Sequence, residues 1–178
     1  MTAYAVFETA LGWAALAWGD AGLAAVRLPA DGPEAARQGV VRKLPGAQEA
    51  DPTPEAAQVI AGIRRLLAGE KADLSFARLD DAGLSELQAR VYAIARAIPP
   101  GETLTYGEVA ERLGDKRLAQ QVGQALGQNP WPIVVPCHRV TAAGGKLGGF
   151  SAPGGADTKR RLLALEGARA VAQQDLFG

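Results

Sequence analysis

The stretch from residue 129 to residue 140 constrains this chain more than any other, because it combines three prolines with the only cysteine and the only histidine among 178 residues. Proline fixes φ and removes a backbone donor. The apolar run 133–135 between two of the prolines predicts a short buried strand. Cys137 then follows a rigid apolar segment and adjoins His138. A thiol is a strong nucleophile only as the thiolate, and a neighbouring imidazole can accept its proton, so the stretch is a candidate reaction centre.

The alternative is a cysteine that only fills the core, which on composition alone is the more common case. The neighbouring residues favour chemistry. The run Asn-Pro-x-Pro-Ile-Val-Val-Pro-Cys-His-Arg-Val resembles the active-site signature of the O6-alkylguanine-DNA alkyltransferases, repair proteins that transfer an alkyl group from guanine O6 to their own cysteine. The similarity extends over residues 84–167, nearly half of the chain.

The chain is predicted to have two domains and a tail. Residues 1–83 hold no ligand cluster, phosphate-binding loop or repeat and are interpreted as a scaffold, which ends at the polar break 80–83. Residues 84–167 carry the reaction centre, and residues 168–178 form the tail. The resemblance implies an α/β first domain with a small antiparallel sheet and helices, similar to ribonuclease H. It implies a mostly α second domain with a winged helix-turn-helix.

Local patterns predict the elements. In the first domain we expect an antiparallel meander of three strands at residues 4–8, 12–18 and 23–28. Two helices that begin with proline should follow at 33–43 and 54–67, the second capped by Thr53. A further strand is expected at 74–79. In the second domain Ser85 caps a helix to about residue 98, and Thr105 with Glu108 forms a capping box. That box begins a helix to residue 113, and a second helix over 118–126 completes helix-turn-helix spacing.

The second helix of this pair has small or uncharged residues, including Ala119, Gln120 and Gly123. This composition favours close backbone approach to a narrow groove of DNA, although a packed helical hairpin is an alternative. The glycine-rich stretch 144–155 either lines a pocket or is a plain loop. Residues 159–161 open a last helix that ends at Gly167, and their positive charges either grip phosphates or cover a solvated face.

The resemblance implies a role for each site residue. Cys137 is the alkyl acceptor, His138 takes its proton through a water, Glu166 orients and charges the histidine, Tyr106 donates to the base, and Asn129 braces the turn that holds Cys137. The residues implied to bind DNA are Ala119, Gln120, Gly123, Arg139, Ser151 and Lys159. No metal and no cofactor are expected.

The chain departs from the family pattern at three places. Gln120 stands where the family has an intercalating arginine, Phe150 replaces a usual tyrosine, and the loop over 151–159 is about two residues longer than usual. These changes bear on activity toward duplex DNA and on the range of alkyl groups.

Charge and composition limit the partners. Residues 1–83 carry 8 basic and 11 acidic residues, whereas residues 84–167 carry 10 basic and 7 acidic ones, so the second part is the one suited to DNA. Residues 1–20 lack the basic start of a signal peptide and are too polar for a membrane span. One cysteine excludes an internal disulfide and a cysteine-rich zinc cluster. We expect a cytoplasmic monomer that acts on double-stranded DNA carrying O6-alkylguanine, without a membrane.

Four other functions remain open from the residues. A lesion-binding protein that transfers nothing would lack the acceptor cysteine, which is present here. A thiol hydrolase would need an oxyanion hole that the sequence does not reveal. A regulator would bind unmodified operator DNA through the helix-turn-helix. Another repair reaction on the same scaffold, such as base excision, is suggested by Gln120 and Phe150.

Overall fold

The computed structural model describes residues 1–145 and 155–167. The chain forms two compact units, of which the first comprises residues 1–82 together with 130–134. The second comprises residues 83–129 and the chain from 135 onward. The sequence-based boundary after residue 83 did not anticipate that five residues next to the reaction centre belong to the first unit.

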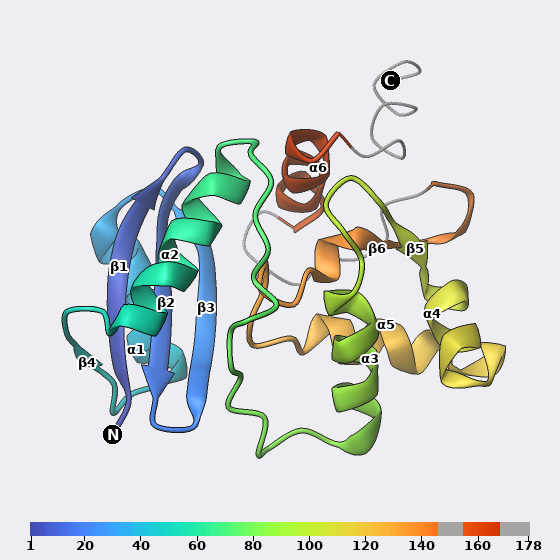
Figure 1. Ribbon diagram of the computed structural model, residues 1–178, viewed down its shortest axis with the longest axis horizontal. Coiled ribbons are helices and arrows are strands. Elements are labelled where there is room, and N and C mark those ends of the chain that lie inside the picture. Colours follow the sequence, from blue (N-terminus) through green and yellow to red (C-terminus); the bar gives the residue numbers. More distant parts are fainter. Residues whose placement is uncertain (146–154, 168–178) are drawn as a thin grey trace. The chain divides into compact units, whose positions relative to one another are not determined.

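The sheet of the first unit has the strand order β3-β2-β1-β4 (Figure 1). Strands β1 (Ala3–Thr9), β2 (Gly12–Gly19) and β3 (Gly22–Ala30) form the predicted antiparallel meander. Strand β4 (Gln48–Glu49) pairs in parallel with β1. The sheet is therefore mixed, whereas a purely antiparallel sheet was expected. A strand of two residues is too short to leave an alternating pattern in the sequence.

Helices α1 (Pro33–Lys43) and α2 (Pro54–Leu67) have the predicted bounds, and Thr53 Oγ1 accepts the Ala56 N–H at 3.2 Å as the expected cap. They cover opposite faces of the sheet (Figure 1). The reason is the alternation of side chains along the strands. One core cluster joins α1 to one face of the sheet and contains Tyr4, Ala15, Ala17, Ala25, Ala36 and Val40.

The predicted strand over 74–79 is wrong. The Asp73 carboxylate accepts the Ser75 N–H at 2.9 Å, and this local turn competes with strand pairing. Only Leu79 forms a bridge, parallel to Leu23. The Leu23 N–H donates to Arg78 O at 2.8 Å, and the segment therefore borders part of the free edge of β3.

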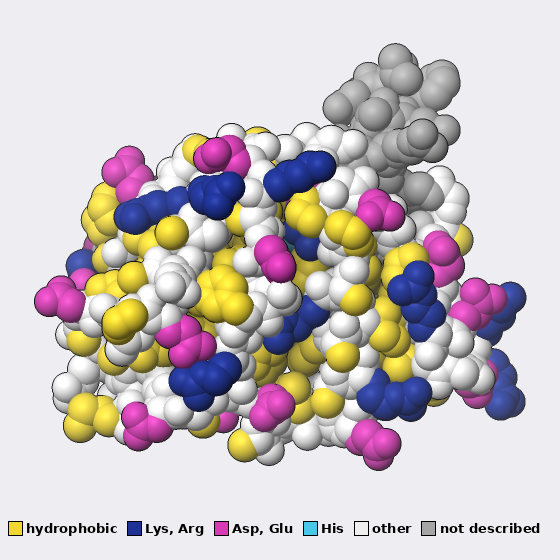
Figure 2. Space-filling model, viewed as in Figure 1, with side chains coloured by type: hydrophobic (Ala, Val, Ile, Leu, Met, Phe, Trp, Pro, Cys, Tyr) yellow, Lys and Arg dark blue, Asp and Glu magenta, His cyan; other side chains and the backbone are white. Residues whose placement is uncertain are grey.

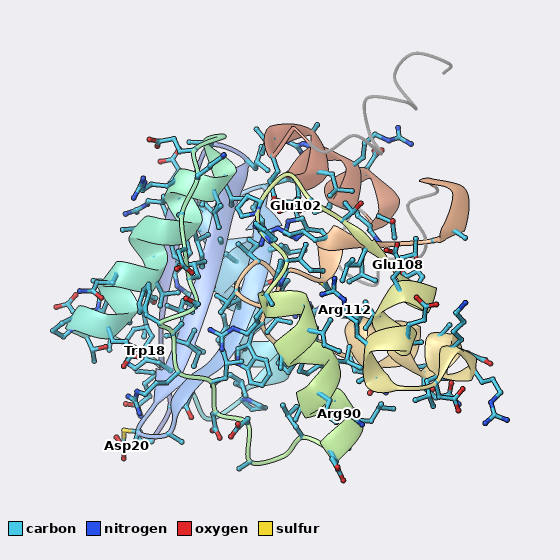
Figure 3. The ribbon with its side chains drawn as sticks, turned by 45° about the vertical axis from the view of Figure 1, so that its right-hand side comes forward. Trp18, Asp20, Arg90, Glu102, Glu108 and Arg112 are labelled. Carbon is cyan, nitrogen blue, oxygen red and sulfur yellow. The ribbon has the colours of Figure 1, made fainter. Side chains whose placement is uncertain are left out.

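The second unit begins with the helices that the sequence predicts. Helix α3 (Glu86–Arg96) starts at a capping box of Ser85 and Gln88 and is two residues shorter than expected. Helix α4 (Tyr106–Leu113) starts at the predicted capping box, in which Thr105 and Glu108 exchange bonds of 3.0 and 3.1 Å. Glu108 can be seen at the start of α4 in Figure 3. Gly114 ends α4 with a left-handed φ of 103°.

The short 3-10 helix η1 (Lys116–Leu118) leads directly into α5 (Ala119–Gly127). Two side chains of α3 form hydrogen bonds with α4 and α5. The Tyr92 O–H donates to Ala125 O at 2.6 Å, and the guanidinium of Arg90, labelled in Figure 3, donates to Leu113 O at 3.0 Å. These bonds join α3 to both members of the α4–α5 pair.

The remaining elements of the second unit surround the cysteine. They are β5 (Leu104–Thr105), η2 (Cys137–Arg139), β6 (Val140–Thr141), η3 (Ala143–Gly145) and α6 (Gly155–Leu165). Strands β5 and β6 pair in parallel. Within residues 1–145 and 155–167, the structure has no helix long and apolar enough to cross a membrane.

Candidate active site

The predicted strand over 133–135 is wrong, because Ile133 lies in a turn with φ of 76°. A left-handed conformation is unusual for a β-branched residue and persists only where the surroundings determine it. Here the side-chain amide of Asn129 donates to Val135 O at 2.8 Å, and the Cys137 N–H donates to the same carbonyl at 2.7 Å. Asn129 thus closes the turn immediately before the cysteine.

Residues 130–134 are anchored inside the first unit. Trp131 Nε1 donates to Leu23 O at 2.7 Å, and Pro130 O accepts the Val26 N–H at 2.9 Å. Trp131 is fully buried. These contacts cover backbone groups of the edge strand β3, which would otherwise be free to pair with another chain. Residues 130–134 are therefore held against β3 of the first unit.

Helix η2 presents three buried functional side chains in succession. Cys137 is 5% exposed, His138 2% and Arg139 6%. A 3-10 helix has three residues per turn, so consecutive side chains point in different directions. The three neighbours in sequence therefore reach different sets of groups, although His138 and Arg139 both contact the Glu166 carboxylate.

The Glu166 carboxylate forms hydrogen bonds with two of these side chains, His138 and Arg139. It directly follows α6, and its carboxylate is paired with His138 Nε2 through Oε1. Arg139 Nε donates to Oε2 of the same carboxylate at 2.8 Å, and Arg139 Nη1 donates to Ile98 O at 2.7 Å. The expectation that Arg139 binds DNA is not supported, because its guanidinium is buried and its hydrogen bonds lie inside the unit.

Lys159 also points inward and is 1% exposed, although it was expected to bind DNA. Its ammonium donates to Val140 O at 2.6 Å and lies 3.5 Å from the Tyr106 hydroxyl. The physical reason is helix periodicity, since Lys159 shares the buried face of α6 with Leu162 and Leu163. Arg160 and Arg161 are exposed, so the cationic triplet is divided between two faces.

Burial raises the pKa of the Cys137 thiol, so the resting cysteine is protonated at neutral pH. Hydrogen bonds from the Asn129 side chain and from the backbone of Cys137 and His138, together with the charge of Lys159, act in the opposite direction and favour the thiolate. The site therefore holds a thiol that needs a base, in surroundings arranged to stabilise the anion once it forms.

His138 is suited to be that base. Burial lowers its pKa, and the charges of Arg139 and Lys159 add to this, while Glu166 raises the pKa but does not outweigh them. Burial thus leaves the resting imidazole neutral, while Glu166 favours the charged form that arises when His138 accepts a proton. Its Nδ1 is buried and has no hydrogen-bond partner among the described residues. A carboxylate accepts only from protonated Nε2, so Nδ1 carries the lone pair.

Burial alone would raise the pKa of Glu166, but the hydrogen bonds and charges of His138 and Arg139 outweigh it and lower the pKa. The carboxylate is thus ionised at neutral pH. Burial and the nearby Cys137 raise the pKa of Tyr106, so this residue is a neutral phenol that can donate. Tyr92, which the sequence did not single out, also interacts with Cys137, and burial raises its pKa to about 12. The only sign of Tyr92 in the sequence is its position next to Val91, which belongs to the apolar face of the predicted helix.

The other residues expected to bind DNA differ in their exposure. Gln120 is exposed on α5, and Ala119 and Gly123 on the same helix are half-buried. A β-carbon added to Gly123 would lie 4.0 Å from Tyr106 Cε1, which places this part of α5 next to the tyrosine. Ser151 and Phe150 lie outside the described residues. No hydrogen bond or ion pair joins Ala119 or Gln120 to Cys137 in the part of the chain that the structure describes.

Comparison with known proteins agrees with this arrangement. Residues 86–168 match the family model described as 6-O-methylguanine DNA methyltransferase, DNA binding domain. A methylated-DNA–protein-cysteine methyltransferase of Methanothermobacter thermautotrophicus is 37% identical over 150 residues, which is 84% of this chain and 77% of that protein.

Solved structures give the same result over the whole length. The O6-methylguanine methyltransferase of Mycobacterium tuberculosis is 34% identical, with a TM-score of 0.72 and coverage of 100% of both chains. The structure of that organism's OGT in complex with DNA has a TM-score of 0.71 at 31% identity and covers 99% of both chains. Because the identity reaches 37% over 84% of the chain in one relative and 34% over the whole length of a solved structure, the chain belongs to the family of the methylated-DNA–protein-cysteine methyltransferases.

Proposed function

We propose that this protein repairs DNA by transferring the alkyl group of O6-alkylguanine irreversibly to Cys137. The observation that carries the proposal is a buried histidine next in sequence to a buried, protonated thiol, with its Nε2 held by Glu166 and its Nδ1 without a hydrogen-bond partner among the described residues. A neutral imidazole in that state can accept the thiol proton, directly or through a water molecule. The anionic sulfur is then the nucleophile.

The transfer itself is one displacement at carbon. The thiolate forms the S–C bond with its electron pair as the C–O6 bond breaks, and that electron pair leaves with the guanine. Tyr106 is proposed to donate its O–H proton to the base, which then departs neutral. Lys159 lies 3.5 Å from the Tyr106 hydroxyl and supplies the positive charge beside the phenolate that remains. The thioether has no further leaving group for water to displace, so each molecule acts once.

Guanine O6 lies inside the base stack of a duplex, so a buried thiol reaches it only if the nucleotide rotates out, which costs a few kcal/mol. We propose that α4 and α5 form the helix-turn-helix that binds the DNA, in a winged arrangement, and that the first unit has the ribonuclease H-like fold. We also propose that the protein acts as a monomer in the cytoplasm, where reducing conditions keep Cys137 a thiol.

The test of the function is the mass of the protein and of the DNA after reaction. Duplex DNA with one O6-methylguanine is incubated with excess protein, and intact mass spectrometry is applied to both. One methyl group should appear on the protein, on Cys137, with restored guanine in the DNA. Repeated turnover, or release of free base with unmodified Cys137, would instead indicate a hydrolase or a base-excision reaction.

Affinity for DNA should depend weakly on salt. The second unit has an excess of only three basic residues, and Figure 2 shows Lys and Arg side chains interspersed with Asp and Glu on the visible face. Few phosphates are then neutralised, so we expect a log–log slope of binding constant against salt of about −2 to −4. Titration by fluorescence anisotropy at four salt concentrations measures it. A slope near −10 would show that the charges gather on another surface.

Gly123→Ala should stabilise the protein and weaken its DNA binding. The nearest described atom to the added carbon is Tyr106 Cε1 at 4.0 Å, so no clash among the described residues requires glycine here. Alanine inside a helix is favoured by about 0.5–1 kcal/mol. If the backbone of α5 approaches DNA closely, the methyl group weakens lesion binding. Thermal unfolding and anisotropy measure the two effects, and unchanged binding would place the DNA away from this part of α5.

Gln120→Arg should accelerate transfer on fully paired duplex. An arginine can enter the space that a flipped nucleotide leaves and donate to the unpaired partner base. Glutamine lacks the charge, and if charge-assisted bonds exceed neutral ones by about 1 kcal/mol, the flipped state gains about fivefold from arginine. Single-stranded lesions need no flipping and serve as the control. Equal acceleration on both substrates would assign Gln120 a different role.

A further inference from the structure

Arg139 follows His138 directly and shares its partner. Both side chains are buried and reach the Glu166 carboxylate, whose side chain is itself 7% exposed. Arg139 Nε lies 2.8 Å from Oε2 and 3.3 Å from Oε1, while His138 Nε2 takes Oε1. Arg139 Nη1 is fixed separately by Ile98 O at 2.7 Å. The guanidinium therefore has one orientation, and it fixes the carboxylate.

The carboxylate needs this partner. A buried carboxyl group beside a neutral imidazole takes up a proton unless a permanent charge compensates the anion. A protonated Glu166 could donate to His138 and would not require the proton to stay on Nε2. The charges that act on His138 are those of Glu166, Arg139 and Lys159. In the described part of the chain, only Arg139 and His138 are hydrogen-bonded to the Glu166 carboxylate.

We propose that Arg139 is a positioning residue for proton transfer, which keeps Glu166 ionised and oriented so that His138 holds its proton on Nε2 and accepts the Cys137 proton on Nδ1. This inference rests on the proposed function for its relevance to repair. The side-chain hydrogen bonds of Arg139 in the described part of the chain go to Glu166 and Ile98, so its positioning effect on His138 is exerted through Glu166. The sequence suggested a contact with DNA instead, and the two roles give different results when DNA is absent.

The experiment measures the reaction of Cys137 with iodoacetamide, without DNA, between pH 5.5 and pH 9, by intact mass. The variants are Arg139→Gln, Arg139→Lys, Glu166→Gln and the double variant Arg139→Gln/Glu166→Gln. Arg117→Gln is the matched control, because Arg117 is paired with Asp115 at an exposed position. Circular dichroism verifies that each protein is folded, and the double variant removes both charges together, so it leaves no buried charge uncompensated.

Arg139→Gln should slow alkylation at pH 7 by about tenfold or more, as expected for the loss of general-base assistance, and Arg139→Lys should restore part of the rate. In the Glu166→Gln background, Arg139→Gln should change the rate less than about twofold, because coupled residues are not additive. Arg117→Gln should react like the parent protein.

Three outcomes would overturn the inference. Arg139→Gln could react like the parent, or it could slow Glu166→Gln by the same factor as the parent. In a separate anisotropy titration with DNA, it could alter only the salt dependence of binding. The third result would return Arg139 to the role of a phosphate contact. If the parent protein fails to demethylate DNA but the coupling between Arg139 and Glu166 is found, the proposed function fails and the positioning role stands.

Discussion

Cys137→Ser should bind O6-methylguanine DNA as tightly as the parent protein, within about twofold, and transfer no methyl group. A serine hydroxyl is weakly acidic, and it becomes a nucleophile at carbon only with far more assistance than a thiol. His138 can take a proton from the thiol because surrounding hydrogen bonds and Lys159 stabilise the thiolate. An alkoxide in the same buried place would be too basic to form. Intact mass and fluorescence anisotropy measure transfer and binding.

Two controls make this result specific. Serine is nearly isosteric with cysteine, so the melting temperature should change little although position 137 is buried. Since Cys137 is the only cysteine of the chain, no other thiol can accept the group. A methylated serine variant, or repair of the DNA without a change in protein mass, would remove Cys137 from the mechanism.

The sequence predicted those elements whose signals are local. The meander follows from alternating side chains and from glycine at its turns, and the starts of α2, α3 and α4 follow from capping residues whose bonds the structure contains. Signals of this kind depend on neighbours within four residues, so they are readable without knowledge of the fold.

Elements that depend on distant contacts were missed. The run 133–135 has the composition of a strand, but Trp131 is bonded to Leu23, more than a hundred residues away, and Ile133 takes a left-handed conformation in the turn that results. Composition also predicted a strand over 74–79, where the Asp73 turn prevailed. At 133–135 a distant contact overrode local propensity, whereas at 74–79 a local hydrogen bond between residues two apart did so.

The site was predictable in part. Adjacency suggested Cys137 and His138, and the family resemblance supplied Glu166, Tyr106 and Asn129. The directions of Arg139 and Lys159 were not predicted, because a positive charge was interpreted as a surface feature. The clue for Lys159 was present in its spacing from Leu162 and Leu163, which marks the buried face of α6. No local signal gives the direction of Arg139, since its partners Ile98 and Glu166 are distant in sequence.

Glu166→Gln should slow methyl transfer by about 100-fold or more, because general-base assistance accelerates a reaction by about 10²- to 10⁴-fold. DNA binding should stay within about twofold of the parent protein. Glutamine can accept the bond from His138 Nε2 but lacks the charge that stabilises the imidazolium. It also leaves the buried Arg139 without its anion, which costs about 3–5 kcal/mol of folding free energy. Single-turnover rates must therefore be measured at a temperature where circular dichroism shows the variant folded.

The pH profile distinguishes lost assistance from a misfolded site. In the parent protein the pKa of His138 is held below its usual 6.5 by burial, so transfer should stay constant from neutral pH to below 6.5 and decline only at lower pH. Glu166 raises that pKa, so its removal should move the decline to still lower pH and reduce the plateau as well. A misfolded site would reduce the plateau without that shift. A decline that moves to higher pH, or an unchanged plateau, would show that Glu166 does not support the charge on His138.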